Sequence, residues 1–377
     1  MEHLEKRELR STPPDHNSVE GTGALSRSTD FQSQRLIYSD TTKPTKALLS
    51  FLNEELRPKA SHSIEEEYPS LFGSYPGGES LYVEKNNRVV SHVGHMAREF
   101  QHALFRFRFG MLGSVITDHR FRGMGMASSL LREALQELRR KGAILALLWS
   151  EHTEFYLPLG FHRAGRETDL RFAPERMPEQ TGTVREFETQ DLTSLWRLYQ
   201  RHSLKIDRSL EELRALCRIP RTRIFVTERN GILTSYLAVN KGADFEGYIH
   251  EWGGELQDLQ RNIAHCQRYL LPEIKLTLIA PASVDLGPVK QIAVEKLDGV
   301  VGLMKLLDRP KLMATYLDFL KKSNVPFSWG RERDTLKVNG IELPVRTDAD
   351  CLALIFGDPT HSAHPALPFF VWGFDSI

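Results

Sequence analysis

Residues 115–127 read Val115-Ile116-Thr117-Asp118-His119-Arg120-Phe121-Arg122-Gly123-Met124-Gly125-Met126-Ala127. The apolar start predicts a strand and the polar residues 118–122 predict a loop. Glycines at 123 and 125 remove side chains where the backbone must approach another group. Apolar residues then recur at the spacing of one buried helical face: Ala127, Leu130, Leu131, Ala134, Leu135 and Leu138. The stretch therefore predicts a strand, a tight turn and an amphipathic helix.

The sequence also predicts where this helix ends. Three cations at 139–141 suit the negative end of the helix dipole, and Gly142 is a typical residue just past a helix. The apolar run Ala143–Trp149 then predicts a strand buried on both faces. Strands and helices that alternate in this way predict an α/β fold.

The start of the helix is a predicted anion site. The first N–H groups of a helix lack partners within it, and the helix dipole is positive there. Backbone N–H groups from Arg122 to Ala127 can therefore hold a phosphate or pyrophosphate, helped by the positive charges of Arg120 and Arg122. The turn is not a dinucleotide-binding GxGxxG, because Ser128 stands at the third glycine position. A purely structural turn is the alternative reading of the glycines alone.

The longer pattern resembles a known family. Arg120-x-x-Gly123-x-Gly125 follows an apolar strand, and Phe155-Tyr156-x-x-Leu159-Gly160-Phe161 follows the next strand. In this order and spacing, the two motifs resemble the acetyl-CoA signature and the last conserved segment of the GNAT superfamily of N-acetyltransferases. The resemblance covers about Leu36–Phe172.

The resemblance implies acetyl-CoA as the cosubstrate and a role for each matching residue. Val115, Ile116 and Thr117 would lie on a splayed strand that pairs with the pantetheine arm and faces the thioester carbonyl. Tyr156 would protonate the departing thiolate, a role that suits a phenol that is neutral at pH 7; a merely packed aromatic ring is the alternative. The remaining cofactor residues would be Arg122, Gly123, Met124, Gly125, Met126 and Ala127 at the pyrophosphate, with Ser150 and Glu151 beside the cofactor.

Composition limits the other classes of function. Lys plus Arg and Asp plus Glu both number 49, so the formal net charge is zero, which argues against a nucleic-acid partner. Three scattered cysteines, Cys217, Cys266 and Cys351, fit a reducing compartment and no metal site. His92 and His95 are weak metal evidence, because on a strand this spacing directs the two rings to opposite faces. Without a membrane-length apolar run or a secretory leader, the protein is expected in the cytoplasm and without a membrane partner.

A chain of 377 residues predicts several domains. Residues 1–35 are polar and are expected to be disordered. Residues 36–175 form the predicted acetyl-CoA domain, which includes a short helix at 64–71. The three glutamates at 65–67 in that helix form a solvated first turn or attract a cationic acceptor.

Residues 183–283 repeat the strand and helix pattern of the first domain, including a hairpin across Arg229-Asn230-Gly231. They resemble a second GNAT domain that is degenerate, because Glu251 and Glu255 stand where a pyrophosphate would need positive charge. A scaffolding role is expected for this domain.

Residues 284–377 form a small α/β domain, with a strand-like run at 298–307 and a helix at 310–321. The aromatic tail 367–377 is expected to dock against the body of the protein. The domain order resembles the enhanced-intracellular-survival group of acetyltransferases. That resemblance implies a sterol-carrier-like last domain, a homo-oligomer, and the terminal carboxylate as the base, carried over to Ile377. A solvated carboxylate on a hydrophobic tail is the alternative.

The sequence thus predicts an N-acetyltransferase that moves an acetyl group to an amine in a ternary complex, with a small molecule or a lysine as acceptor. The acceptor cleft is expected between the domains, lined by Tyr156, residues 64–71 and the C-terminal tail. The competing hypothesis is an acetyl-CoA-binding scaffold or regulatory protein without turnover.

Overall fold

The computed structural model describes residues 36–39, 44–73, 77–177, 183–330, 334–357 and 364–377. The predicted disordered segment 1–35 lies outside the described residues. The described residues belong to one compact unit, and their strands form three sheets.

The first sheet carries the quoted strand near its centre. Its strands follow the order β1-β2-β3-β4-β5-β15-β6, and β9 pairs with β3. Only β4 and β5 run parallel to each other; the other described neighbours are antiparallel. The bounds are β1 Leu36–Ser39, β2 Gly78–Lys85, β3 Arg88–Gln101, β4 Arg106–Thr117, β5 Leu145–Leu148, β6 His162–Ala164, β9 Lys205–Ile206 and β15 Gly302–Leu306.

The predicted amphipathic helix is confirmed as α4, Met126–Arg140. It packs against β3 and β4. Its apolar face is buried, at about 1.5–3 kcal/mol for each fully buried leucine, and Gly142 follows it with φ +85°. The other helical segments around this sheet are α2 Lys46–Leu56, α3 Ile64–Glu67, α5 Thr153–Tyr156 and the 3-10 turns His119–Phe121 and Leu157–Leu159.

The second sheet follows the order β14-β7-β13-β12-β11-β10-β8, with β12 and β13 parallel. The predicted hairpin across Arg229-Asn230-Gly231 joins β10 and β11. The strands are β7 Glu167–Arg171, β8 Thr183–Glu186, β10 Arg223–Arg229, β11 Ile232–Val239, β12 Tyr248–Gly254, β13 Thr277–Pro281 and β14 Glu295–Gly299. The helices are α6 Leu192–Gln200, α7 Leu210–Leu216, α8 Leu256–His265 with a π-helical turn Cys266–Leu270, α9 Gly287–Ile292, and the 3-10 turns Pro174–Arg176 and Thr189–Asp191.

The two large sheets exchange strands. β7 follows β6 in the chain but pairs with β13 and β14 of the second sheet. β15 follows β14 but inserts between β5 and β6 of the first sheet. The strand-like run predicted at 298–307 is therefore wrong as one element, because its residues belong to two strands in different sheets. The predicted segments 36–175 and 284–377 share one sheet.

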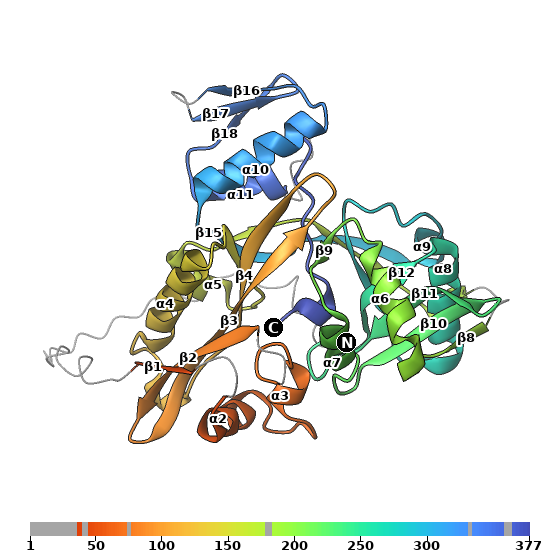
Figure 1. The fold of residues 1–377 in the computed structure, drawn as a ribbon, viewed down its shortest axis with the longest axis horizontal. Helices are drawn as coiled ribbons and strands as arrows, with labels where there is room; N and C mark the ends of the chain where they lie inside the picture. The colour runs from red at the N-terminus through yellow and green to blue at the C-terminus, as the bar shows by residue number, and fades with distance from the viewer. Residues whose placement is uncertain (1–35, 40–43, 74–76, 178–182, 331–333, 358–363) are drawn as a thin grey trace, which may run out of the picture. The chain divides into compact units, whose positions relative to one another are not determined.

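The third sheet contains β16 Phe327–Gly330, β17 Thr335–Val338 and β18 Ile341–Pro344 in sequential order. It lies beside α10 Arg309–Lys322 and α11 Asp348–Phe356 (Figure 1). The tail that follows ends in a 3-10 turn, Gly373–Asp375. A sterol-carrier-like fold for this part stays a prediction.

As predicted, the aromatic tail docks against the body of the protein. The Phe369 ring lies 4.9 Å from the ring of Phe100 and 5.2 Å from that of Phe109, between ring centroids, so the tail covers the first sheet. Within the ranges described above, no helix has both the length and the apolar character that crossing a bilayer requires.

Candidate active site

The strand β4 separates from β5 just before the quoted turn. The described β4–β5 ladder joins Gly110 to Ala146 and Met111 to Leu147. Beyond it, residues 114–117 have no strand partner on that side among the described strands, and all four are half-buried. Val115, Ile116 and Thr117 therefore lie on the splayed end of the strand, with backbone groups available for another molecule.

A bulge interrupts β4 at the same place. Gly94 of β3 pairs with Gly113, and His92 pairs with Ile116. Two residues of β4, Ser114 and Val115, therefore stand opposite one residue of β3. Ser114 has φ +50°, a left-handed conformation that costs a residue with a side chain about 1–2 kcal/mol. Other interactions in the folded protein must offset this conformational free energy, so the bulge is a fixed feature of this strand edge.

The start of α4 is open. Its N-cap, Gly125, has φ +77°, makes no side-chain capping bond, and is followed by no acidic residue in the first turn. Gly123 also has φ +77°, and no atom lies within 4 Å of where its Cβ would be. Residues 122–125 are exposed, whereas the Met126 side chain is buried in the core. The first N–H groups of the helix are thus available to an anion; that they hold a pyrophosphate stays a prediction.

The two arginines of the turn differ in their partners. The Arg120 guanidinium lies 2.6 Å from a carboxylate oxygen of Asp118, and its hydrogen bonds lower the pKa of Asp118 to about 2. Arg122 donates from Nε to the carbonyl of Thr117 at 3.1 Å and has no ion-pair partner among the described side chains. Arg122 therefore keeps its charge available at the predicted pyrophosphate position, and Arg120 does not.

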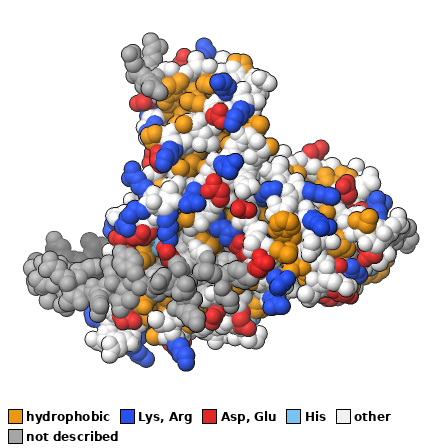
Figure 2. Space-filling view, in the orientation of Figure 1, with side chains coloured by type: hydrophobic (Ala, Val, Ile, Leu, Met, Phe, Trp, Pro, Cys, Tyr) orange, Lys and Arg blue, Asp and Glu red, His pale blue; other side chains and the backbone are white. Residues whose placement is uncertain are grey.

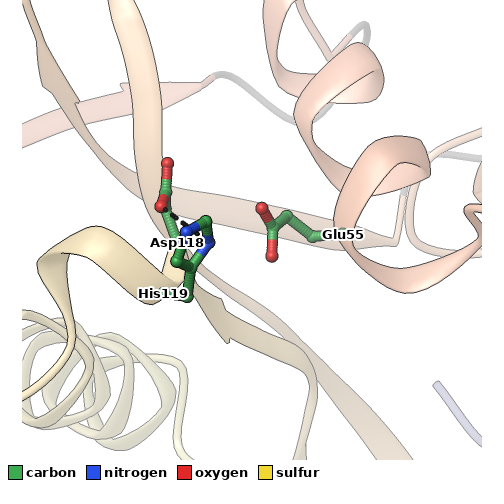
Figure 3. A group of neighbouring side chains, drawn as sticks. All are labelled: Glu55, Asp118 and His119. Carbon is green, nitrogen blue, oxygen red and sulfur yellow. Dashed lines mark ion pairs between the residues drawn. The ribbon is translucent and has the colours of Figure 1, made fainter.

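Glu55, Asp118 and His119 gather beside this turn (Figure 3). Glu55 extends from α2 toward the other two, and the three candidate ligand atoms lie within 4.8 Å of one another. His119 Nδ1 is 3.5 Å from Asp118. Since both Asp118 oxygens already accept hydrogen bonds from Arg120, this carboxylate is committed to that cation. The absence of a metal from the active site stays a prediction.

Tyr156 ends α5 and is only 6% exposed. Its ring packs edge-on against Phe155 and Phe161, with centroids 4.9 and 5.8 Å away. Burial raises the pKa of the Tyr156 phenol, and a hydrogen bond with Ser150 opposes the rise. The phenol is therefore protonated at pH 7. Ser150 is half-buried beside it, whereas Glu151 is exposed.

A lysine from the inserted strand β15 supports the segment that carries Tyr156. Lys305 Nζ donates to the carbonyl of Leu159 at 2.7 Å, in the 3-10 turn directly after Tyr156. Gly160 follows with φ +83°, and a Cβ there would meet the same ammonium. The strand exchange between the sheets therefore fixes the loop that carries the predicted acid.

Ile377 lies against the bulged end of β4, beside the β3–β4 pair (Figure 1). Gly113 has no side chain, and a Cβ at this position would overlap the carboxyl carbon and oxygen of Ile377. The Ile377 residue is 9% exposed. The two residues predicted to be catalytic come from distant parts of the chain: Tyr156 ends α5, which follows β5, and Ile377 lies against Gly113 of β4.

Lys241, from the loop after β11, binds the tail just before Ile377. Its Nζ donates to the carbonyls of Gly373 and Ser376, both at 2.7 Å, and to the Ser376 hydroxyl at 2.9 Å. All three ammonium protons therefore have an acceptor. Burial lowers the pKa of Lys241 to about 8, and Asp244, Asp375, Glu67 and Glu251 oppose the decrease.

A second buried cation holds the same tail. Arg208 Nη2 lies 2.6 Å from the Asp375 carboxylate, and Nη1 lies 2.8 Å from Glu251. All three side chains are buried. Glu251, predicted as a charge that opposes a pyrophosphate, thus neutralises a buried arginine, whereas Glu255 is exposed at the start of α8.

The segment 64–71 contributes fewer free charges than its sequence suggests. Glu66 closes a capping box with Ser63. Glu67 is buried, accepts from Arg57, and lies 2.6 Å from His62 Nε2 and from the backbone N–H of Ala243. Glu65 and Glu66 are exposed and match the predicted solvated turn, although Glu66 also caps the helix, whereas the buried Glu67 does not match it. Figure 2 shows acidic and basic side chains interspersed over the face that it displays.

The sequence did not predict a role for Lys241, Arg208 or Lys305, and it suggested His92 only as a weak metal ligand. No local pattern marks the three cations, because each acts on a partner far away in the chain; Lys241 and Gly373 are 132 residues apart.

Part of the chain matches a family model, and solved structures share its fold. The family model described as an acetyltransferase (GNAT) domain matches residues 48–164. No curated protein sequence matches the chain at a significant level.

Three solved structures have a similar fold. A conserved protein of unknown function from Enterococcus faecalis V583, described as a probable N-acyltransferase, is 15% identical, with a TM-score of 0.59 over 79% of this chain and 76% of that one. A GCN5-related N-acetyltransferase from Anabaena variabilis is 14% identical, with a TM-score of 0.56 over 74% and 75%. One from Kribbella flavida is 16% identical, with a TM-score of 0.53 over 75% and 74%.

Proposed function

We propose that the chain is an acyltransferase that transfers an acetyl group from acetyl-CoA to an amine, a proposal supported by the match of residues 48–164 to the acetyltransferase (GNAT) domain model. The observation that carries this proposal is the open N-terminus of α4 beside the splayed end of β4. The first offers N–H groups to a pyrophosphate, and the second offers an unpaired strand edge to the pantetheine arm.

The proposed cofactor residues divide by role. Arg122, Gly123, Met124, Gly125, Met126 and Ala127 hold the pyrophosphate, mainly through backbone N–H groups. Val115, Ile116 and Thr117 pair with the arm, and one of their N–H groups faces the thioester oxygen, where negative charge develops during attack. Ser150 and Glu151 lie beside the cofactor.

Tyr156 and Ile377 exchange protons with the reacting groups. The amine nitrogen attacks the thioester carbon, a C–N bond forms and the C–S bond breaks. The carboxylate of Ile377 accepts the proton that the amine loses, and Tyr156 donates its proton to the departing sulfur. The raised pKa of Tyr156 keeps that proton in place at neutral pH.

The acceptor is a small-molecule amine or a lysine side chain. Of the carboxylates close to the tail, Asp375, Glu251 and Glu67 already bind cations of the protein. The Ile377 carboxylate is then the anionic group that meets the amine. We place the acceptor between the 64–71 segment, Tyr156 and the tail.

The test compares two glycines at opposite ends of α4. Gly123 and Gly142 have φ +77° and +85°, and open space surrounds each Cβ position. Gly123→Ala and Gly142→Ala should therefore cost similar stability, about 1–2 kcal/mol. Calorimetric titration with acetyl-CoA should show one site per chain that only Gly123→Ala weakens.

The wild-type protein is then screened with a set of amines, and CoA release is measured for each one. Equal affinities of the two variants would remove the cofactor site from this turn. Tight binding of acetyl-CoA with no turnover on any amine would instead favour a scaffold or regulatory protein.

A further inference from the structure

His92 lies on β3 beside the bulge of β4, and its imidazole is completely buried. Its Nδ1 is 2.8 Å from the carbonyl oxygen of Ser114. A carbonyl only accepts hydrogen bonds, so Nδ1 carries the proton and donates it. The Phe72 ring packs against the imidazole, with centroids 5.8 Å apart, which leaves the ring little freedom to turn.

The residue that receives this hydrogen bond is the strained one. Ser114 is the non-glycine residue of β4 with a positive φ, and it is one of the two bulged residues. Next to it, the Ser91 hydroxyl lies 2.8 Å from the Thr117 hydroxyl and 3.3 Å from the carbonyl of Ile116. Two consecutive side chains of β3 therefore hold the segment 114–117 by groups other than the regular strand ladder.

The charge state of His92 suits a fixed donor. Burial lowers the pKa of His92 to about 4; the neighbouring His95 adds to the decrease, and the hydrogen bond to Ser114 opposes it. The imidazole is therefore neutral at pH 7, and Nδ1–H leaves Nε2 as a bare lone pair. Nε2 is buried and has no hydrogen-bond partner among the described residues. The structure thus tolerates an unsatisfied atom, at about 1–3 kcal/mol, in order to keep the donor at Nδ1.

We infer that His92 is a positioning residue: its Nδ1–H group holds the Ser114 carbonyl and so sets the direction of the backbone N–H groups that follow in 115–117. This inference rests on the proposed function, in which those groups meet the pantetheine arm and the thioester oxygen. The position of an N–H group that faces a developing charge must be correct to within a fraction of an ångström. A displacement of about 1 Å can lower the rate by about 10²-fold.

Asparagine and glutamine separate this role from simple packing. The amide nitrogen of Asn reaches the position of Nδ1, whereas that of Gln reaches the position of Nε2. We expect His92→Asn to keep kcat/KM and the acetyl-CoA dissociation constant close to those of the wild type. His92→Gln and His92→Phe should lower kcat/KM by about tenfold or more and weaken acetyl-CoA binding.

A structural role alone would make activity follow the melting temperature of the variants instead of the presence of the donor. If Asn and Phe are equally impaired, the inference is overturned.

Nitrogen-15 NMR of the wild-type protein provides a measurement that needs no variant. A neutral His92 protonated at Nδ1 is expected from pH 7 down to pH 5, and protonation at Nε2 would refute the assignment. If the wild-type protein turns over no amine, the proposed function fails, yet the NMR spectrum and the acetyl-CoA affinities still decide the role of His92.

Discussion

The carboxyl group of Ile377 lies on the bare backbone of Gly113, where any side chain would overlap its carbon and oxygen. Gly113 immediately precedes the bulge of β4, so the carboxylate stands next to the segment proposed to hold the thioester. The absence of a side chain at residue 113 is therefore a condition for this placement.

Gly113→Ala should displace the Ile377 carboxylate and lower kcat by about 10²-fold, with acetyl-CoA binding retained. The matched control is Gly110→Ala on the same strand, where the added methyl meets the flexible end of Leu138. That variant should lose about 1–3 kcal/mol of stability and keep its rate. Steady-state CoA release and urea unfolding measure the two effects. A glycine added after Ile377 should reproduce the rate loss, and full activity of that extended chain would exclude Ile377 as the base.

Tyr156→Phe should lower kcat by about 10²-fold, because the departing thiolate loses its proton donor. The comparison variant is Tyr316→Phe in α10, which removes a hydroxyl that donates to the carbonyl of Pro365, just before the tail. It should lose stability only. Equal rates for Tyr156→Phe and the wild type would remove Tyr156 as the acid, and a thiol assay with saturating acetyl-CoA makes the comparison direct.

Lys241→Met should loosen the tail, because two carbonyls and a hydroxyl lose their shared donor. Each buried acceptor left without a partner costs about 1–3 kcal/mol. We expect a fall in kcat with an unchanged acetyl-CoA dissociation constant, measured by calorimetry. Lys205→Met removes a lysine that binds the carbonyl of Gln200 and serves as the control. A weakened acetyl-CoA affinity in Lys241→Met alone would contradict a role confined to the tail.

Stability should decrease between about pH 6.5 and pH 4. Burial lowers the pKa of His92 and His202 to about 4 and that of His250 to about 3, so these rings stay neutral when folded but take up protons when unfolded. Each contributes a loss of about 1.4 kcal/mol per pH unit in that window, and none above it. His202→Gln keeps a donor for the carbonyl of Trp252 and removes one titration. Urea unfolding at several pH values should show a shallower slope for this variant, and an identical slope would disprove the assignment.

Local patterns were sufficient for the elements that carry the cofactor turn. The helix α4 and its glycine ends follow from apolar spacing and from two backbone conformations that favour glycine. The hairpin between β10 and β11 follows from Asn230-Gly231 for the same reason. These features depend on residues a few positions apart, which a sequence displays directly.

The pairing of strands that lie far apart in the chain could not be predicted from the sequence in the same way. The residues around Val301 continue one apolar run, yet the chain changes sheets there, because the partners of β14 and β15 lie far away in sequence. The tail contacts of Lys241 and Arg208 have the same origin. A single charged residue in a polar loop gives no local indication that its partner is more than a hundred residues away.

The insertion of β15 also has a consequence for how the protein folds. Of the described strands, β15 alone connects β6 to the first sheet. The first sheet therefore cannot be completed until residues 302–306 have been synthesised. During synthesis the edges of β5 and β6 would be unpaired, which exposes them to aggregation. Pairing over such sequence distances is slow, and the two sheets are expected to form in one late, cooperative step. Residues 48–164 expressed alone would then lack the strand that completes their sheet.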